Sequence, residues 1–128
     1  MTWVLSQRSE HHLSRVHPDL ANIVQRALAI SSVDFIVIEG VRTLERQRQL
    51  VASGVSRTMA SRHLSGHAVD IAPWINNTIP WDNWGAFEQV AKAMKQAALE
   101  VSIPLVWGGD WTSFRDGPHF ELPRGGCL

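Results

Sequence analysis

The 128-residue sequence predicts an α+β domain built on a small, mostly antiparallel sheet with flanking helices. Three observations predict this fold class. A helical segment comes first, strand-like and helical segments then mix, and they do not follow the regular βαβ order of a parallel sheet. The length suits one core, so we expect a single domain over residues 1–128, and the 45% hydrophobic content is enough to fill that core.

The first half of the chain predicts a helix, a strand and a second helix. Residues 1–16 are mixed and give no assignment. Residues 18–30 form an amphipathic pattern, with apolar residues at helical spacing: Leu20, Ile23, Val24, Ala27 and Leu28. Residues 33–38 are nearly all apolar and β-branched, which is typical of a buried strand. Thr43 is a suitable N-cap for a helix that continues to about residue 52.

The second half predicts three strands and the longest helix. In the strand over residues 68–72, alternation places Asp70 between two alanines on one face, which leaves room above it for a metal ion and its water. Asp82 is the expected cap of a helix over residues 83–100. Residues 105–107 and 119–122 are short strand segments separated by glycine-rich turns.

Composition excludes several classes of protein. The formal net charge is zero, which argues against non-specific nucleic-acid binding and against a polybasic tail. Cys127 is the single cysteine, so any metal must be held by His, Asp or Glu. The N-terminus does not read as a signal peptide, and no apolar run reaches transmembrane length. We therefore expect a protein without membrane insertion that is made in the cytoplasm, and a monomer is the default expectation.

Three candidate metal ligands stand in two stretches, residues 61–70 and 116–121. His63, Asp70 and His119 give the three protein ligands typical of catalytic zinc sites, which keep one position for water. Zinc would lower the pKa of that water toward about 7. Each residue could instead be an ordinary surface, core or turn residue, since short motifs often occur by chance. The metal site therefore stays a hypothesis on spacing alone.

His67 is the rival of His63 as a ligand. The two are four positions apart, the spacing of a helical ligand pair, but residue 64 is Leu where such sites carry Glu. Ser65-Gly66 also argues against a helix, so we expect His67 at the rim of the site or behind its ligands. A carboxylate that orients a ligand histidine could be Asp110, or less favourably Glu121.

Two further residues fit catalytic roles. Asp116 lies three residues before His119 across a Gly-Pro turn, so both can face one cavity, and Asp116 would act as the general base. Arg42 follows a strand end and would stabilise the oxyanion, although Glu39 could instead pair with it. Trp107 could line a substrate groove near the Gly-Gly turn, while a core position is the default for a tryptophan.

These motifs together resemble the M15 zinc peptidases, the family of D-Ala-D-Ala carboxypeptidases and dipeptidases and of phage L-alanyl-D-glutamate endopeptidases. The resemblance rests on the motifs Ser61-x-His63-x-x-Gly66-x-Ala68-x-Asp70, Asp116-x-x-His119, Glu39-Gly40-Val41-Arg42 and Trp107-Gly108-Gly109-Asp110-Trp111. It implies that His63, Asp70 and His119 bind one zinc ion. It also implies that Asp116 is the base, that Arg42 stabilises the oxyanion and that Ser61 positions substrate or a ligand.

The resemblance further implies the fold shared by DD-peptidases and Hedgehog domains, and bacterial peptidoglycan as the substrate. The aspartate base, where many carboxypeptidases carry glutamate, and the short chain favour the endolysin-like branch, which cuts the L-Ala–D-Glu bond of stem peptides. Phage members reach the wall through a separate membrane-permeabilising protein. The alternatives are a D-Ala-D-Ala carboxypeptidase and a non-catalytic, zinc-containing wall-binding module.

Overall fold

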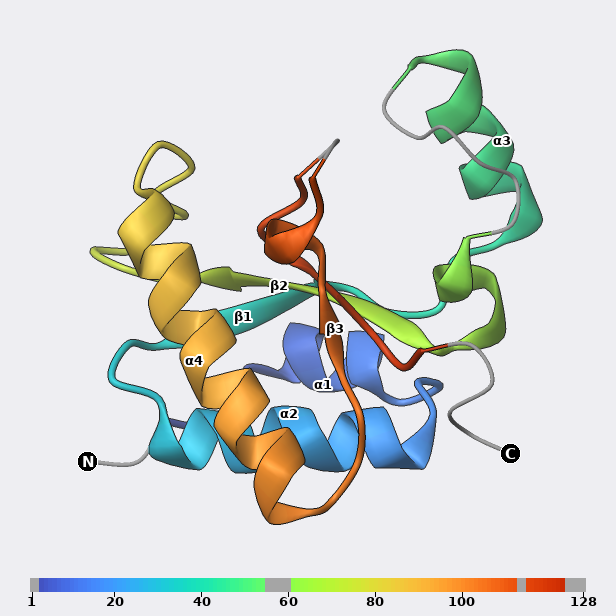
Figure 1. Ribbon diagram of the computed structural model, residues 1–128. Helices are drawn as coiled ribbons and strands as arrows, with labels where there is room; N and C mark the ends of the chain where they lie inside the picture. The colour runs from blue at the N-terminus through green and yellow to red at the C-terminus, as the bar shows by residue number, and fades with distance from the viewer. Residues whose placement is uncertain (1–2, 55–60, 113–114, 124–128) are drawn as a thin grey trace.

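The computed structural model describes residues 3–54, 61–112 and 115–123 and confirms the α+β class (Figure 1). Its antiparallel sheet has the order β1-β2-β4-β3 and comprises β1 (Phe35–Glu39), β2 (Ala68–Pro73), β3 (Val106–Trp107) and β4 (His119–Glu121). The helices are α1 (Gln7–Leu13), α2 (Pro18–Ile30), α3 (Leu44–Ala52) and α4 (Trp84–Glu100), with short 3-10 helices η1 (Arg62–Ser65) and η2 (Gly108–Asp110). Within these ranges, no helix is long and apolar enough to span a membrane.

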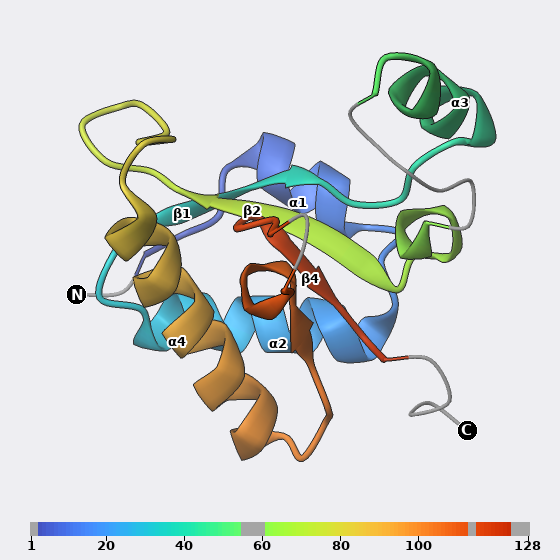
Figure 2. The same ribbon diagram turned by 45° about the horizontal axis from the view of Figure 1, so that its top comes forward.

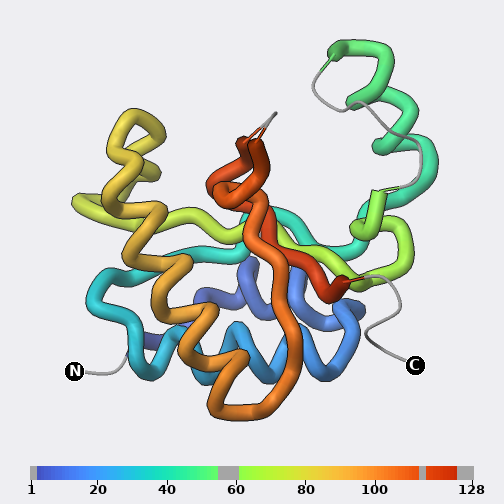
Figure 3. The backbone as a smooth tube through the Cα atoms, in the orientation of Figure 1, coloured from blue at the N-terminus to red at the C-terminus, as the bar shows by residue number. Residues whose placement is uncertain are grey.

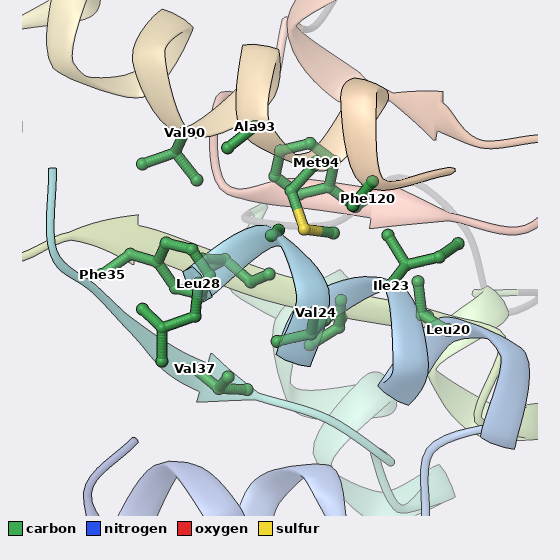
Figure 4. Close-up of a cluster of buried hydrophobic side chains, with 14 of the residues drawn as sticks. Leu20, Ile23, Val24, Leu28, Phe35, Val37, Val90, Ala93, Met94 and Phe120 are labelled. Atoms are coloured by element: carbon green, nitrogen blue, oxygen red, sulfur yellow. The ribbon is translucent and has the colours of Figure 1, made fainter. Parts of the chain in front are cut away.

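The core lies between the sheet, α2 and α4 (Figure 4). The apolar stripe predicted for α2 is buried as expected, and Leu20, Ile23 and Val24 are fully buried. Met94 of α4 reaches the same cluster, and Phe120 of β4 closes it from the sheet side. Burying side chains of this size contributes roughly 1.5–3 kcal/mol each, so this cluster is the rigid base under the sheet.

The short 3-10 helices η1 and η2 were not predicted from the sequence, and neither was helix α1. Its seven residues bury only Ser9 and Leu13, too few for a periodic apolar signal. Polar contacts fix it instead, because Ser6 accepts a hydrogen bond from the Ser9 N–H and the Ser9 hydroxyl accepts one from the Val37 N–H. The cap of α4 is another correction: Asn83, one residue after the expected Asp82, accepts the Ala86 N–H.

Helix α3 stands apart from the rest of the molecule in both the ribbon and the backbone tube (Figures 1 and 3). It begins where predicted, because the Thr43 hydroxyl accepts a hydrogen bond from the Arg46 N–H. Its buried residues are Gln47 and Leu50, and Gln47 is fully buried despite its polar side chain. A polar contact therefore takes part in anchoring this helix, at the end nearest β1.

Candidate metal centre and active site

The register of the sheet brings the three predicted ligands together. Asp70 of β2 pairs with His119 of β4 on one side and with Glu39 of β1 on the other. His63 comes from η1, which precedes β2. Figure 2 shows β2 and β4 side by side, with η1 where β2 begins. One ligand atom from each of His63, Asp70 and His119 lies within 4.8 Å of the others, so this group could hold a metal ion.

His63 is almost fully buried, and the backbone fixes its orientation. Its Nδ1–H donates to the Gly40 carbonyl at 2.9 Å, which leaves Nε2 facing the Asp70 carboxylate at 3.2 Å. The Ser61 hydroxyl accepts a hydrogen bond from the His63 N–H and so caps the start of η1. Gly66 ends η1 in the left-handed conformation, with φ of 78°, which a glycine adopts without strain.

His119 is oriented by a carboxylate. Its Nε2–H donates to Glu121 at 2.7 Å, and its Nδ1 lies 3.4 Å from the same Asp70 oxygen that faces His63. Burial disfavours the charged imidazole, but the hydrogen bonds with Asp70 and Glu121 outweigh burial and raise the pKa of His119 to about 9. Burial also opposes the charge on Asp70, yet its hydrogen bonds with His119 and His63 hold its pKa well below the usual range.

This arrangement fits a cation. In the neutral His63, the nitrogen facing Asp70 is an acceptor, and two acceptors at 3.2 Å need a proton or a metal ion between them. The partners behind the histidines, the Gly40 carbonyl and Glu121, direct one ring nitrogen of each toward Asp70. The donor set of two imidazoles and one carboxylate suits zinc.

Arg42 lies beside this group in a network of buried polar side chains. Its guanidinium donates twice to Glu39 and once to Gln47, each at 2.8 Å, and its Nη2 lies 3.6 Å from Asp70 Oδ2. The Arg42 N–H also donates to the His63 carbonyl at 2.9 Å. Pairing with Glu39 and a place at the site are therefore compatible. Gln47 is a member of the site that sequence reasoning missed, because a buried glutamine gives no apolar signal.

Asp116 is half-buried next to His119, whose N–H donates to its carbonyl at 3.2 Å. Burial, followed by the negative charge of Asp70, raises the pKa of the Asp116 carboxyl. The Asp116 N–H donates to the Gly108 carbonyl at 3.0 Å, and a Cβ at Gly108 would lie 2.5 Å from the Asp116 carbonyl oxygen. The glycine is thus required where η2 meets the Asp116 turn.

Trp107 occupies the core, the default position for a tryptophan. Its ring is 6% exposed, stacks between Trp84 and Phe120, and donates its Nε1–H to the Gly117 carbonyl at 2.7 Å. It therefore supports the Asp116 turn from beneath. Trp111 is the partly exposed tryptophan at the site, with its ring centroid 5.1 Å from that of His119.

Two of the alternatives considered for the site lie outside it. Asp110 is exposed and forms an ion pair with Lys95 at 2.6 Å, so the carboxylate that contacts a candidate ligand histidine is Glu121. His67 is not part of the ligand group: its Nδ1 bonds Ser65 and its ring lies against that of His17. The strand alternation that placed Glu121 on the face of His119 was the signal that could have ranked it first.

A His-Asp-His group formed by two strands of an antiparallel sheet and the 3-10 helix before them, with a half-buried carboxylate and an arginine beside it, defines a metallopeptidase-type site. The model of the family "Phage L-alanyl-D-glutamate peptidase" matches residues 1–123, and the chain belongs to this family. The L-alanyl-D-glutamate peptidase of Escherichia phage T5 is 38% identical over 98% of this chain and 93% of its own. The Bacillus subtilis endopeptidase CwlK is 30% identical over 85% of this chain and 74% of its own.

Solved structures agree with this assignment. The L-Ala D-Glu endopeptidase ChiX of Serratia marcescens has a TM-score of 0.87 and 44% sequence identity, over 94% of this chain and 90% of its own. The vancomycin-resistance D,D-dipeptidase VanXYg, at 17% identity and a TM-score of 0.50, covers 84% of this chain and 50% of its own. The match to VanXYg shows a shared fold alone, whereas the match to ChiX also agrees in sequence.

Proposed function

We propose that residues 1–128 form a single catalytic domain, a zinc-dependent endopeptidase that hydrolyses the L-alanyl–D-glutamate bond of peptidoglycan stem peptides. One observation carries this proposal: the His63, Asp70 and His119 atoms converge within 4.8 Å in a chain of the phage L-alanyl-D-glutamate peptidase family. The relatives from phage T5, Bacillus subtilis and Serratia marcescens are named for that activity.

The three ligands would hold one zinc ion through His63 Nε2, Asp70 and His119 Nδ1. When bound, zinc would polarise the scissile carbonyl and lower the pKa of water at the site. The protein supplies the rest of the chemistry. Asp70 is held ionised by its two histidine neighbours, and Gly40 and Glu121 direct the histidines.

Asp116 is the proposed general base and acid. Its carboxyl is half-buried and its pKa is raised, which moves proton exchange closer to neutral pH than at an exposed aspartate. It would accept the proton of the attacking water and deliver it to the leaving amine of the D-glutamyl residue. Arg42 would stabilise the oxyanion, because Glu39 and Gln47 already hold its charge in place, so little reorganisation is needed during the reaction.

The same-class alternative is a D-Ala-D-Ala carboxypeptidase, and the other alternative is a non-catalytic, zinc-containing wall-binding module. Asp116 and Arg42 favour an enzyme, since a structural metal site needs neither a base nor a fixed positive charge. We further propose that the protein acts as a monomer. Like the phage enzymes it resembles, it would be made in the cytoplasm and reach the wall through a separate membrane-permeabilising protein.

The direct test is mass spectrometry of the products released from intact peptidoglycan by the zinc-loaded protein. We expect peptides with a new N-terminal D-glutamate, with L-alanine left on the glycan. Free D-alanine would move the enzyme to the carboxypeptidase alternative. Zinc-loaded protein that releases neither product would support the binding module instead.

The role of Asp116 gives a second test. In Asp116→Ala, turnover should fall by about 10²- to 10⁴-fold, the usual contribution of a general acid–base. Zinc content, measured by elemental analysis, should stay at the wild-type level because Asp116 is outside the ligand group. Asp110→Ala removes an exposed carboxylate from the neighbouring turn and should keep full activity. Full activity of Asp116→Ala would remove it from the mechanism.

A further inference from the structure

A cavity of about 500 Å³ lies at the end of β1 and β2 opposite the metal centre. Asp34 directly precedes β1 and Trp74 directly follows β2, and the Trp74 N–H donates to the Asp34 carbonyl at 2.9 Å. The lining residues are Trp3, Ser32, Val33, Asp34, Trp74, Ile75, Asn76 and Asn77. Trp74 is four residues from the ligand Asp70, or roughly 13 Å along a strand.

The lining combines aromatic rings with neutral hydrogen-bonding groups. Trp3 and Trp74 supply two half-buried indoles, and the Trp3 ring is fixed by its Nε1–H, which donates to the Ser31 carbonyl at 3.2 Å. Asn76 and Asn77 supply two exposed amides at the tip of a tight turn, both with positive φ and closed by the bridge between Ile75 and Thr78. Aromatic residues and residues with hydrogen-bonding side chains thus line the same space.

This chemistry matches a sugar better than the other common ligand classes. A pyranose ring presents C–H groups that pack on an indole and hydroxyl or acetamido groups that bond amides and carboxylates. Phosphates and carboxylates are usually bound by arginine or lysine, and neither is present among the described residues that line this cavity. Asp34 adds a carboxylate, which disfavours an anionic peptide and accepts hydrogen bonds from hydroxyl groups.

We propose that this cavity binds the glycan strand that carries the stem peptide. The inference rests on the proposed function, because in peptidoglycan the L-alanine of the stem is attached to a sugar. A scissile L-Ala–D-Glu bond at the metal centre therefore holds the glycan within one residue of the site. Contacts to neighbouring sugar units at the cavity would raise the effective concentration of the peptide at the metal centre.

The experiment compares two substrates and two tryptophan variants. Trp74→Ala removes one ring from the cavity, whereas Trp81→Ala removes a ring that is 62% exposed and stacks on Phe87 outside the cavity. With intact peptidoglycan, Trp74→Ala should raise KM by roughly five- to tenfold at unchanged kcat, the range expected for one lost aromatic contact. With a soluble stem peptide that lacks glycan, both variants should match the wild type.

A binding measurement separates this proposal from the proposed function. Peptide-free glycan strands should change the tryptophan fluorescence of the wild type and of Trp81→Ala, but not that of Trp74→Ala. Trp74→Phe, which keeps an aromatic face, should restore part of the binding. Equal losses on both substrates, or unchanged glycan binding in Trp74→Ala, would overturn the cavity's role. If the wild type cleaves neither substrate, the proposed function fails, and glycan binding still decides the cavity.

Discussion

The two histidines on either side of Asp70 are oriented by different means. His63 donates to a backbone carbonyl, that of Gly40, while His119 donates to a side chain, that of Glu121. A backbone carbonyl is placed by the fold and survives most substitutions around it. A carboxylate depends on a single residue, and against the effect of burial its hydrogen bond adds to that of Asp70 in raising the pKa of the histidine. The fold therefore fixes the orientation of His63, whereas the orientation and the pKa of His119 depend on one side chain that can be substituted.

The two histidines also differ in the residues that surround them. The residue after His119 on β4 is Phe120, which lies in the core. Trp107 supports the turn before β4 through its hydrogen bond to the Gly117 carbonyl. The His63 side is joined to the polar network of Arg42 and to α3, which stands apart from the body (Figure 3). Substitutions on the two sides should therefore separate effects on folding, on metal affinity and on turnover.

The largest effect on folding stability is expected from Gly40→Ala. A Cβ at Gly40 would lie 1.9 Å from the His12 carbonyl oxygen and 2.9 Å from its carbon, both backbone atoms of α1. Since backbone cannot move aside cheaply, α1 or the Gly40 carbonyl must shift, with a cost of about 1–3 kcal/mol or more. Urea unfolding should show this loss, and zinc affinity should fall with it. Gly85→Ala, at an exposed site in the first turn of α4, should be neutral or stabilising.

A stable Gly40→Ala protein with wild-type zinc affinity would contradict the role of the Gly40 backbone carbonyl in orienting His63. It would mean that His63 holds its orientation without the Gly40 carbonyl. Loss of zinc affinity at unchanged stability would instead place the effect on the carbonyl alone, with α1 able to adapt.

The next largest effect is expected on the His119 side. Glu121→Ala removes both the hydrogen bond and the charge, and zinc affinity should fall by about 10- to 100-fold, as for other partners of metal-ligating histidines. Glu121→Gln keeps an acceptor and should lose less. Competition with a chromophoric chelator measures both variants. Asp110→Asn is the control, because that carboxylate contacts Lys95 and should leave zinc affinity unchanged.

The contrast between Glu121 and Asp110 shows what the sequence could predict of the site. Spacing and strand alternation made His63, Asp70 and His119 candidate ligands, and the folded chain brings one ligand atom of each within 4.8 Å of the others. Asp110 was favoured over Glu121 because it stands beside a glycine turn, but its side chain lies at the surface. The identity of the orienting carboxylate depends on tertiary packing that spacing does not encode.

The same limit applies to the fold. Helix α2 was predicted because its apolar stripe repeats at helical spacing, and the buried residues of α2 and α4 face one core. Helix α1 was missed because polar contacts with β1 hold it, including the one between Ser9 and Val37. Periodicity therefore finds elements that bury apolar faces, and it misses elements that are fixed by a few buried hydrogen bonds.

Gln47 offers a smaller and more selective test on the His63 side. Gln47→Met keeps most of the side-chain volume but removes the acceptor for Arg42 Nη1, a hydrogen bond to a charged group. We expect kcat to fall by roughly tenfold, since Arg42 becomes less well fixed, while zinc content stays at the wild-type level. Gln49→Met, on the exposed side of the same helix, is the matched control. A rise in KM alone would show that Gln47 supports substrate binding rather than the oxyanion charge.

The last prediction concerns protons on the His119 side. In the metal-free protein the pKa of His119 is raised to about 9, so below that pH its imidazole holds a proton that zinc must displace. Zinc affinity should therefore increase by up to about tenfold per pH unit between pH 7 and 8 and level off near pH 9. Glu121→Gln weakens a hydrogen bond that raises this pKa, so its affinity should level off at a lower pH. Parallel pH profiles for the two proteins would show that Asp70 alone holds the proton on His119. Glu121 would then orient His119 without affecting its protonation.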